Sequence, residues 1–221
     1  LKLMITVPGG ATQVEKRAVV SACKNAGASE IYLMSEPLAA AVGAKIPIAQ
    51  SSGHMIINLG GGTTEIAIIS VGQLVVYKSV RTAGGKIDES IIFHLKKYHN
   101  LIIGERTAED IKMKIGFAYL SEGDLGEDLI EIKGRDFQSG LPKVVGVSQK
   151  FISESIQKPL KTILEGVKEV LSRTPPELSA DIVDRGIVLT GGTALLKAID
   201  KYFSYNINVI SFIAEDPLLC V

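Results

Sequence analysis

The chain has 221 residues, enough for one large domain or two small ones. Its 24 basic residues equal its 24 acidic residues, and this balance argues against a nucleic-acid partner, because binding phosphates requires an excess of Lys and Arg. Hydrophobic residues make up 46% of the sequence, which excludes a disordered chain, and the 22 glycines exceed the usual share of about 7%, so their positions need an explanation.

Residues 1–35 predict a βαβ unit. An apolar strand ends at Val7, and Thr12 and Glu15 then have the spacing of a capping box at the start of a helix that Gly27 ends. Residues 31–34 predict the second strand, parallel to the first through a right-handed crossover. Because the chain starts directly with a strand, without a methionine or a signal peptide, we expect it to be part of a longer protein.

A short helix and three closely spaced strands follow. The helix begins at Pro37, a favoured first residue, and ends near Gly43, before a linker-like stretch. The strands, joined by short glycine turns as in a meander of hairpins, are residues 55–59, 65–71 and 74–80.

The second half alternates helices with polar and buried segments. Thr107 is expected to cap a helix that ends at Gly116, and Pro159 is expected to kink or split a long helix that begins at Ser148 and stops at residues 174–176. Polar residues 122–141 predict the strands of a small α+β insertion. The remaining elements are a helix after Gly84-Gly85, a strand over 186–190, a helix over 194–202 and a strand over 207–213.

The cysteines and histidines point to no metal or disulfide. Cys23 and Cys220 have neither metal-binding spacing nor a disulfide pattern, so we expect a reduced, cytoplasmic setting. The three histidines also lack the spacing of metal ligands. No uncharged apolar run approaches the roughly 20 residues that a membrane-spanning helix needs.

Glycine turns are the sharpest chemical feature. Gly60-Gly61-Gly62, followed by Thr63 and Thr64, lets backbone N–H groups and hydroxyls approach a phosphate closely. A glycine-rich hairpin without a ligand explains the same residues about as well. The turns at Gly84-Gly85 and Gly191-Gly192 each open a helix, where free N–H groups favour an anion, but a tight connection that needs small residues is the simpler reason for either turn taken alone.

Glu36 is the best single acid for catalysis. Pro37 pushes it out of helical geometry at the mouth of a helix, where a carboxylate can orient a water molecule for attack on a phosphate. An ordinary glutamate favoured by the helix dipole is the competing interpretation.

Several segments together resemble the ATPase superfamily of actin, heat-shock chaperones and sugar kinases. These are residues 36–41, 59–65 and 189–192. Longer segments are similar to the MreB family of bacterial actin homologues, the rod-shape-determining proteins, and they lie at 104–109, 140–143, 174–178, 184–192 and 214–218. The resemblance covers essentially the whole chain in order.

The resemblance implies an α/β, actin-like (ribonuclease H-like) ATPase fold with ATP and Mg²⁺ between two domains. The resemblance also implies a division into domains. Residues 1–49 and 213–221 would belong to the first domain, residues 50–80 and 144–212 to the core of the second domain, and residues 81–143 to a small subdomain inserted in the second. The family's first phosphate loop lies upstream of Leu1, so we expect that these residues alone do not hydrolyse ATP.

The resemblance also assigns roles to the site residues. Glu36 would orient the attacking water with help from Thr63, and Asn58 would lie near hydrated Mg²⁺, with no residue as a direct metal ligand. The β- and γ-phosphates would contact Gly60, Gly61, Gly62, Thr63 and Thr64. The adenosine would contact Gly84, Glu109, Asp110, Lys112, Gly191, Gly192, Thr193 and Ala194.

Three residues depart from the family's pattern. Asn58 stands where an Asp is usual, Gly85 replaces an acidic residue, and Lys114 replaces a Glu expected beside the ribose. Losing carboxylates weakens a site for a hard cation, so slow, weakened or absent hydrolysis is a consistent expectation.

The function expected from the resemblance is an ATP-binding filament protein that determines cell shape. Its partners would be further copies of itself, the inner face of the cell membrane, and cell-shape or envelope-synthesis proteins, without nucleic acid. A nucleotide-binding scaffold that hydrolyses poorly is the alternative. A chaperone or sugar-kinase type of ATPase is a third, although no peptide-binding or sugar-binding segment follows Val147.

Overall fold

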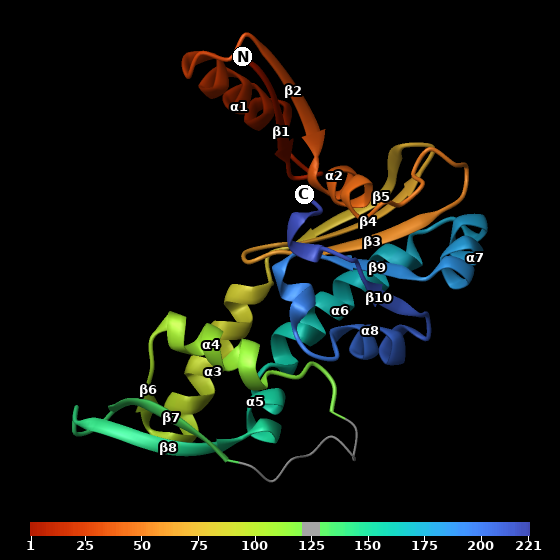
Figure 1. The fold of residues 1–221 in the computed structure, drawn as a ribbon. Helices are drawn as coiled ribbons and strands as arrows, with labels where there is room; N and C mark the ends of the chain where they lie inside the picture. The colour runs from red at the N-terminus through yellow and green to blue at the C-terminus, as the bar shows by residue number, and fades with distance from the viewer. Residues whose placement is uncertain (121–128) are drawn as a thin grey trace.

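The computed structural model describes residues 1–120 and 129–221, and its centre is a five-stranded sheet (Figure 1). The strand order is β10-β9-β3-β4-β5, with parallel pairing among β10, β9 and β3 and antiparallel pairing among β3, β4 and β5. The strand bounds are His54–Leu59 (β3), Thr64–Ser70 (β4), Gln73–Val80 (β5), Ile187–Thr190 (β9) and Ser211–Ile213 (β10). The expected meander of three hairpin strands is therefore confirmed.

Helices cover both faces of this sheet. Successive residues of β3 alternate between the faces: Ile56 packs in a cluster with Ala40 and Ala41 of α2 (Glu36–Gly43), and Ile57 packs in the larger cluster that contains Ile163 of α6 (Gln157–Ser172). All six residues of β3 are buried, as expected for a strand that is covered on both sides. Figure 1 shows α2 on one side of the sheet and α6 and α8 on the other.

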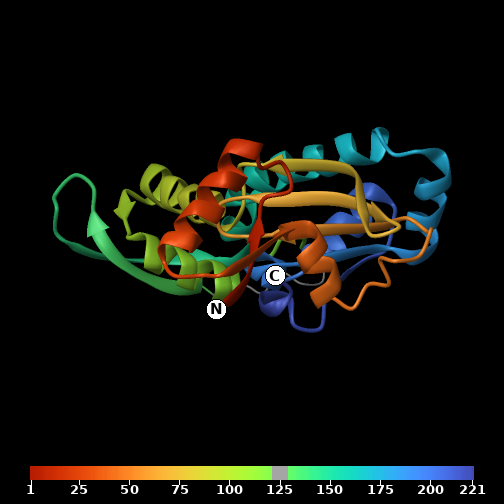
Figure 2. The ribbon, with the colours of Figure 1, turned by 90° about the horizontal axis from the view of Figure 1, so that it is seen from above.

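The predicted N-terminal βαβ unit is present, and it forms a separate two-stranded parallel sheet. Strands β1 (Lys2–Val7) and β2 (Glu30–Ser35) pair along their whole length, and helix α1 (Gln13–Asn25) connects them. Thr12 and Glu15 make the expected capping box, with both reciprocal hydrogen bonds present. The unit projects from the central sheet as an arm (Figure 1), which overlaps the rest of the chain when seen from above (Figure 2). Helix α1 buries none of its residues.

A second lobe lies beyond one end of the sheet, opposite the end where α7 lies (Figure 1). It contains the helices α3 (Gly84–His99), α4 (Glu105–Ile115) and α5 (Gln149–Ser155) and the strands β6 (Leu101–Ile102), β7 (Leu129–Asp136) and β8 (Pro142–Ser148). The insertion thus has the predicted α+β character, although its last strand, β8, lies wholly after residue 141. The part of the prediction that falls on 122–128 lies outside the described residues.

Two helix predictions change at their ends. The N-cap of α4 is Gly104 rather than Thr107, so the helix begins three residues before the expected start and Thr107 lies inside its first turn. The long helix after Ser148 is split, as predicted, but the break lies at Ile156. Pro159 is the third residue of α6, where a missing N–H costs no helical hydrogen bond.

The sequence prediction missed one helix and misplaced two further elements. Helix α7 (Pro176–Arg185) starts at the second proline of the pair that ends α6, because proline suits a first helical position. The helix expected over 194–202 is a 3₁₀ turn (Gly192–Leu195) and then α8 (Ile199–Ile207), and the strand expected over 207–213 contains only its last three residues. Left-handed backbone at Ala198 and Asn208 sets the two ends of α8.

No helix in the described ranges is both long and apolar enough to cross a bilayer. The C-terminal residues after β10 pack beside the turn that follows β9, where Gly191 donates its N–H to the carbonyl of Pro217 at 2.7 Å. Cys220 is buried in the cluster beneath α2. The predicted domain division stays a prediction.

Candidate functional site

A cavity of about 570 Å³ lies where the three glycine turns meet the helices α3 and α4. It brings together residues that are far apart in sequence but were predicted to share one site. Its lining residues are Gly60, Gly61, Gly84, Gly85, Asp88, Glu109, Lys112, Met113, Gly192, Thr193, Leu195, Leu196 and Leu218.

Backbone hydrogen bonds hold the first two turns against each other. The N–H of Gly84 donates to the carbonyl of Gly60 at 3.2 Å, and the N–H of Gly85 donates to the carbonyl of Gly61 at 2.8 Å. The hydroxyl of Thr193, from the third turn, donates to the same Gly60 carbonyl at 2.7 Å. The three turns therefore form one connected floor.

The glycines of this floor are needed for different reasons. A Cβ on Gly84 would lie 2.7 Å from Oγ1 of Thr193, and a Cβ on Gly191 would lie 2.4 Å from the carbonyl oxygen of Leu59, so packing excludes side chains at both positions. A Cβ on Gly61 or Gly62 would meet nothing within 4 Å. No protein atom of the described residues requires glycine there, and the open space would let a ligand approach the backbone closely.

The first turn also has free hydrogen-bond donors. Within the described ranges, the N–H groups of Gly61 and Gly62 donate to no protein acceptor, whereas the N–H of Gly60 donates to the carbonyl of Thr63 at 3.0 Å. Adjacent free N–H groups form a concave site for an anion. The geometry thus favours the phosphate interpretation over a hairpin that needs no ligand.

The hydroxyls of the two threonines after the turn differ. Thr64 is fully buried, and its Oγ1 donates to the carbonyl of Thr82 at 2.8 Å, so it does not point to the turn. Thr63 is exposed and lines a separate cavity of about 400 Å³ between the β1–α1 arm and the strands β4 and β5, with Arg81, Ser79 and Tyr77.

Asn58 is buried at the end of β3. Its Oδ1 accepts a hydrogen bond from Oγ1 of Thr190 at 3.3 Å, and a Cβ on Gly191 would lie 2.8 Å from the same oxygen. Asn58 therefore supports the packing of the third turn against β3. Gly191 and the buried Ala194 belong to that support as well and do not line the cavity.

Glu36 is the first residue of α2, so the expectation that Pro37 excludes it from the helix is wrong. It is partly buried, and this burial raises the pKa of its carboxyl group; the negative charge of Glu65 adds to the increase. Glu65 itself is buried and accepts hydrogen bonds from the hydroxyls of Tyr77 and, at 2.6 Å, Ser79. Glu36 does not line the glycine cavity.

Helix α4 divides its predicted residues between two faces. Glu109 and Lys112, three residues apart, line the glycine cavity. Asp110 and Lys114, four residues apart, line another cavity, of about 320 Å³, together with residues of β7. The structure therefore places neither Asp110 nor Lys114 beside the glycine turns.

The sequence prediction missed two features of the cavity. Met113, Leu195 and Leu218 are each more than half exposed and line it with apolar surface. Asp88 of α3 lines it too, and its Oδ2 accepts a hydrogen bond from Nζ of Lys112 at 2.9 Å. Burial raises the pKa of Asp88 even though the Lys112 ammonium acts to lower it.

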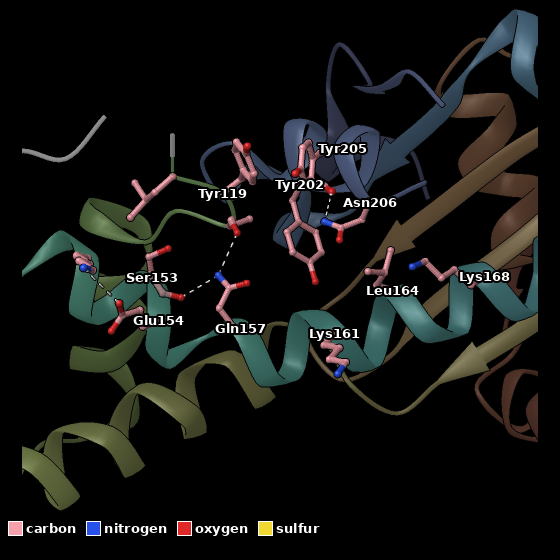
Figure 3. A pocket seen from close by; sticks show the side chains of 13 residues that line it. Tyr119, Ser153, Glu154, Gln157, Lys161, Leu164, Lys168, Tyr202, Tyr205 and Asn206 are labelled. Carbon is pink, nitrogen blue, oxygen red and sulfur yellow. Dashed lines mark hydrogen bonds and ion pairs between the residues drawn. The ribbon is translucent and has the colours of Figure 1, made fainter. Parts of the chain in front are cut away.

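Another cavity, of about 560 Å³, lies away from the predicted site, among α5, α6 and α8 (Figure 3). Aromatic residues, including Tyr119, Tyr202 and Tyr205, share its lining with Lys161 and Lys168. Among the residues that the structure describes, no group of three or more His, Cys, Asp or Glu side chains forms a metal site.

Comparisons with known proteins identify the family of this chain. A family model described as "MreB/Mbl protein" matches residues 1–221. The chain is 43% identical to the cell shape-determining protein Mbl of Bacillus subtilis, of which it covers 65%, and 46% identical to MreB of Haemophilus influenzae, of which it covers 62%. Both alignments include 100% of this chain, so it spans slightly less than two thirds of these relatives.

Solved structures of related proteins have a similar fold. MreB5 of Spiroplasma citri, in a crystal structure bound to ADP, superposes with a TM-score of 0.94 at 39% identity, over 99% of this chain and 65% of that one. A second structure of that protein, bound to AMPPNP, has the same TM-score. The double helical filament of MamK, at 19% identity and a TM-score of 0.76, shares the actin-like fold.

Proposed function

We propose, from the premise that this chain belongs to the MreB/Mbl family, that it carries the nucleotide-binding cleft of an actin-like filament protein that determines cell shape. ATP is the proposed nucleotide, since structures of MreB5 from Spiroplasma citri contain ADP or AMPPNP. The filament is proposed to lie in the cytoplasm at the inner face of the membrane, with envelope-synthesis proteins as partners.

The observation that carries the proposal is the first glycine turn. Gly61 and Gly62 have open space where their Cβ atoms would be, and their N–H groups are free. A turn of this kind fits phosphate oxygens, which approach the backbone closely and accept several hydrogen bonds. We therefore place the β- and γ-phosphates on residues 60–62.

The other end of the cavity suits a nucleoside. Met113, Leu195 and Leu218 supply exposed apolar surface that an adenine ring would cover. Glu109 and Lys112 supply polar groups from one face of α4, as ribose recognition requires. A site with an apolar part, a few polar groups and a phosphate cradle matches the parts of ATP.

Mg²⁺ is proposed to bind through the phosphates and water rather than through this chain directly. Mg²⁺ prefers carboxylate and phosphate oxygens, whereas Asn58 offers a neutral amide oxygen that already accepts a hydrogen bond from Thr190. Bound to the phosphates, Mg²⁺ would neutralise part of their negative charge.

Hydrolysis is proposed to depend on Glu36. A carboxylate whose pKa is raised by burial is a better general base near neutral pH than an ordinary glutamate. Asn58 and Gly85 stand where the family usually has acidic residues, so this site has fewer carboxylates around the phosphates, which favours slow turnover. Lys114 contributes nothing to this expectation, because it lies on the other face of α4.

Electron microscopy of the complete gene product tests the proposal. Filaments that form with ATP or AMPPNP, and fewer with no nucleotide, are the expected result. ADP binding to the complete gene product, measured by calorimetry, is the second arm. If ADP does not bind and no filaments form across a range of salt concentrations and lipids, the proposal is wrong.

A further inference from the structure

One carboxylate oxygen in the glycine cavity is buried without a hydrogen-bond partner. Asp88 and Lys112 pair through Oδ2 and Nζ at 2.9 Å, and their side chains are only 14% and 12% exposed. In the described part of the chain, the other oxygen of Asp88, Oδ1, is buried and accepts no hydrogen bond. A buried acceptor left in this way costs about 1–3 kcal/mol, and more when it is charged.

The charged groups around Asp88 do not supply the missing donor. Lys112 is held on Oδ2, and the other charges that act on Asp88 belong to the carboxylates of Glu105 and Glu109. Carboxylates are acceptors, so they disfavour a second anion and favour a neutral hydrogen-bond donor beside Oδ1.

The position of Asp88 along α3 selects which part of a nucleotide can supply that donor. Asp88 lies four residues after Gly84, which is about 6 Å along a helix axis. Phosphates at the glycine turn would thus be one helical turn away, and phosphate oxygens are anionic acceptors in any case. The groups that follow the phosphates in a nucleotide are the ribose hydroxyls, which donate.

We propose that Asp88 is a ribose-binding residue, whose Oδ1 accepts a hydrogen bond from a ribose hydroxyl of the bound nucleotide while Oδ2 holds Lys112 in the cavity wall. This inference rests on the proposed nucleotide site and adds a specificity to it. The cavity selects ribonucleotides over deoxyribonucleotides, because a deoxy analogue leaves the buried carboxylate oxygen unpaired.

Calorimetry with ADP, 2′-deoxy-ADP and 3′-deoxy-ADP tests the inference on the complete gene product. The wild type is expected to bind ADP at least about tenfold more tightly than the analogue that lacks the contacted hydroxyl. In Asp88→Ala this ratio falls toward one. The matched control is Asp184→Ala, which removes an exposed acid from α7, outside the cavity lining, and keeps the ratio.

Each outcome decides something. If the wild type binds ADP and both analogues equally, or if Asp88→Ala keeps the preference, the ribose contact is wrong while the nucleotide site stands. If no ADP binds, the proposed function fails together with the inference. The adenine amino group is the other hydrogen-bond donor of the nucleotide, and inosine diphosphate lacks it. If Asp88→Ala changes the ratio of the affinities for ADP and inosine diphosphate, Asp88 contacts the base instead of the ribose, and the proposal is overturned.

The wild-type ratio needs no variant, so the proposal can be tested even if Asp88→Ala does not fold. Asp88→Asn supplies a second, less disruptive change. It keeps the volume of the side chain and removes its charge, so the preference for the ribonucleotide is expected to shrink by several-fold. A purely structural ion pair between Asp88 and Lys112 predicts weaker binding of all three nucleotides with an unchanged ratio.

Discussion

The turn at residues 60–62 and the turn at residues 190–192 look alike in sequence but differ in what surrounds their glycines. At Gly191 the backbone has φ of +86°, and a Cβ would lie 2.4 Å from a backbone oxygen of β3. At Gly61 a Cβ would meet no protein atom within 4 Å. One glycine allows two strands to pack closely, and the other leaves room for a ligand. Replacing each of them separates folding from binding.

Gly191→Ala is expected to have the largest effect. Its φ and ψ of 86° and 164° are nearly exclusive to glycine, and the added Cβ would collide with the main chain of Leu59. Strain and overpacking together predict a loss of about 3–5 kcal/mol in the free energy of unfolding. Urea denaturation measures this loss, and a change below about 1 kcal/mol would show that the two strands can separate at low cost.

Gly61→Val should weaken nucleotide binding while leaving the stability of the fold nearly unchanged. The side chain enters open space, so the free energy of unfolding should change by less than about 1 kcal/mol. ADP affinity is expected to fall at least about tenfold, because the branched side chain fills the phosphate cradle. Calorimetry measures the affinity.

Gly104→Val is the matched control for Gly61→Val. A Cβ at Gly104 also meets nothing within 4 Å, but this residue caps α4 outside the cavity. Its variant should lose about 1 kcal/mol through the poorer cap and keep ADP affinity. Equal loss of affinity in both variants would contradict the role of the first turn.

Asn58→Asp asks how the two turns work together in hydrolysis. Asn58 contacts the third turn through Thr190, and an aspartate keeps this acceptor while adding a charge close to the first turn. Phosphate release by the complete gene product should rise several-fold, because a carboxylate strengthens the site for hydrated Mg²⁺. Wild-type turnover as fast as that of the variant would refute the view that Asn58 limits hydrolysis.

Local features of the fold could be predicted from the sequence, and contacts between distant segments could not. The capping box of Thr12 and Glu15 and the break in the helix after Ser148 depend on neighbouring residues, so their patterns sufficed, although the break itself lies three residues before Pro159. The ends of α8 depend on left-handed backbone at Ala198, which no residue preference indicates.

The same limit applies to the site. Glycine turns and helix residues such as Glu109 and Lys112 could be assigned because their sequence segments resemble a family. Asp88 was missed because its importance comes from burial beside Lys112, which is 24 residues away in sequence. Periodicity alone also did not show that Asp110 faces away from Lys112, since that requires knowing which side of α4 the turns occupy.

Glu36→Gln is expected to have the smallest effect on stability and a large one on turnover. Burial and the charge of Glu65 raise the pKa of Glu36 in the folded protein, so the folded state binds this proton more tightly than the unfolded state does. The charged form therefore disfavours folding above the folded-state pKa, and this penalty disappears as the pH falls through that pKa.

The neutral Gln side chain lacks this penalty at every pH. Glu36→Gln should consequently unfold at a slightly higher temperature than the wild type at pH 7, with a change in free energy within about 0.5 kcal/mol. The difference should vanish near pH 4, where the wild-type carboxyl is protonated in the folded state. Thermal unfolding at the two pH values measures it, and phosphate release by the complete gene product should fall in the same variant. A variant that is less stable at pH 7 but hydrolyses ATP normally would make Glu36 a structural residue of α2, which would leave Thr63 and the first turn without their proposed catalytic partner.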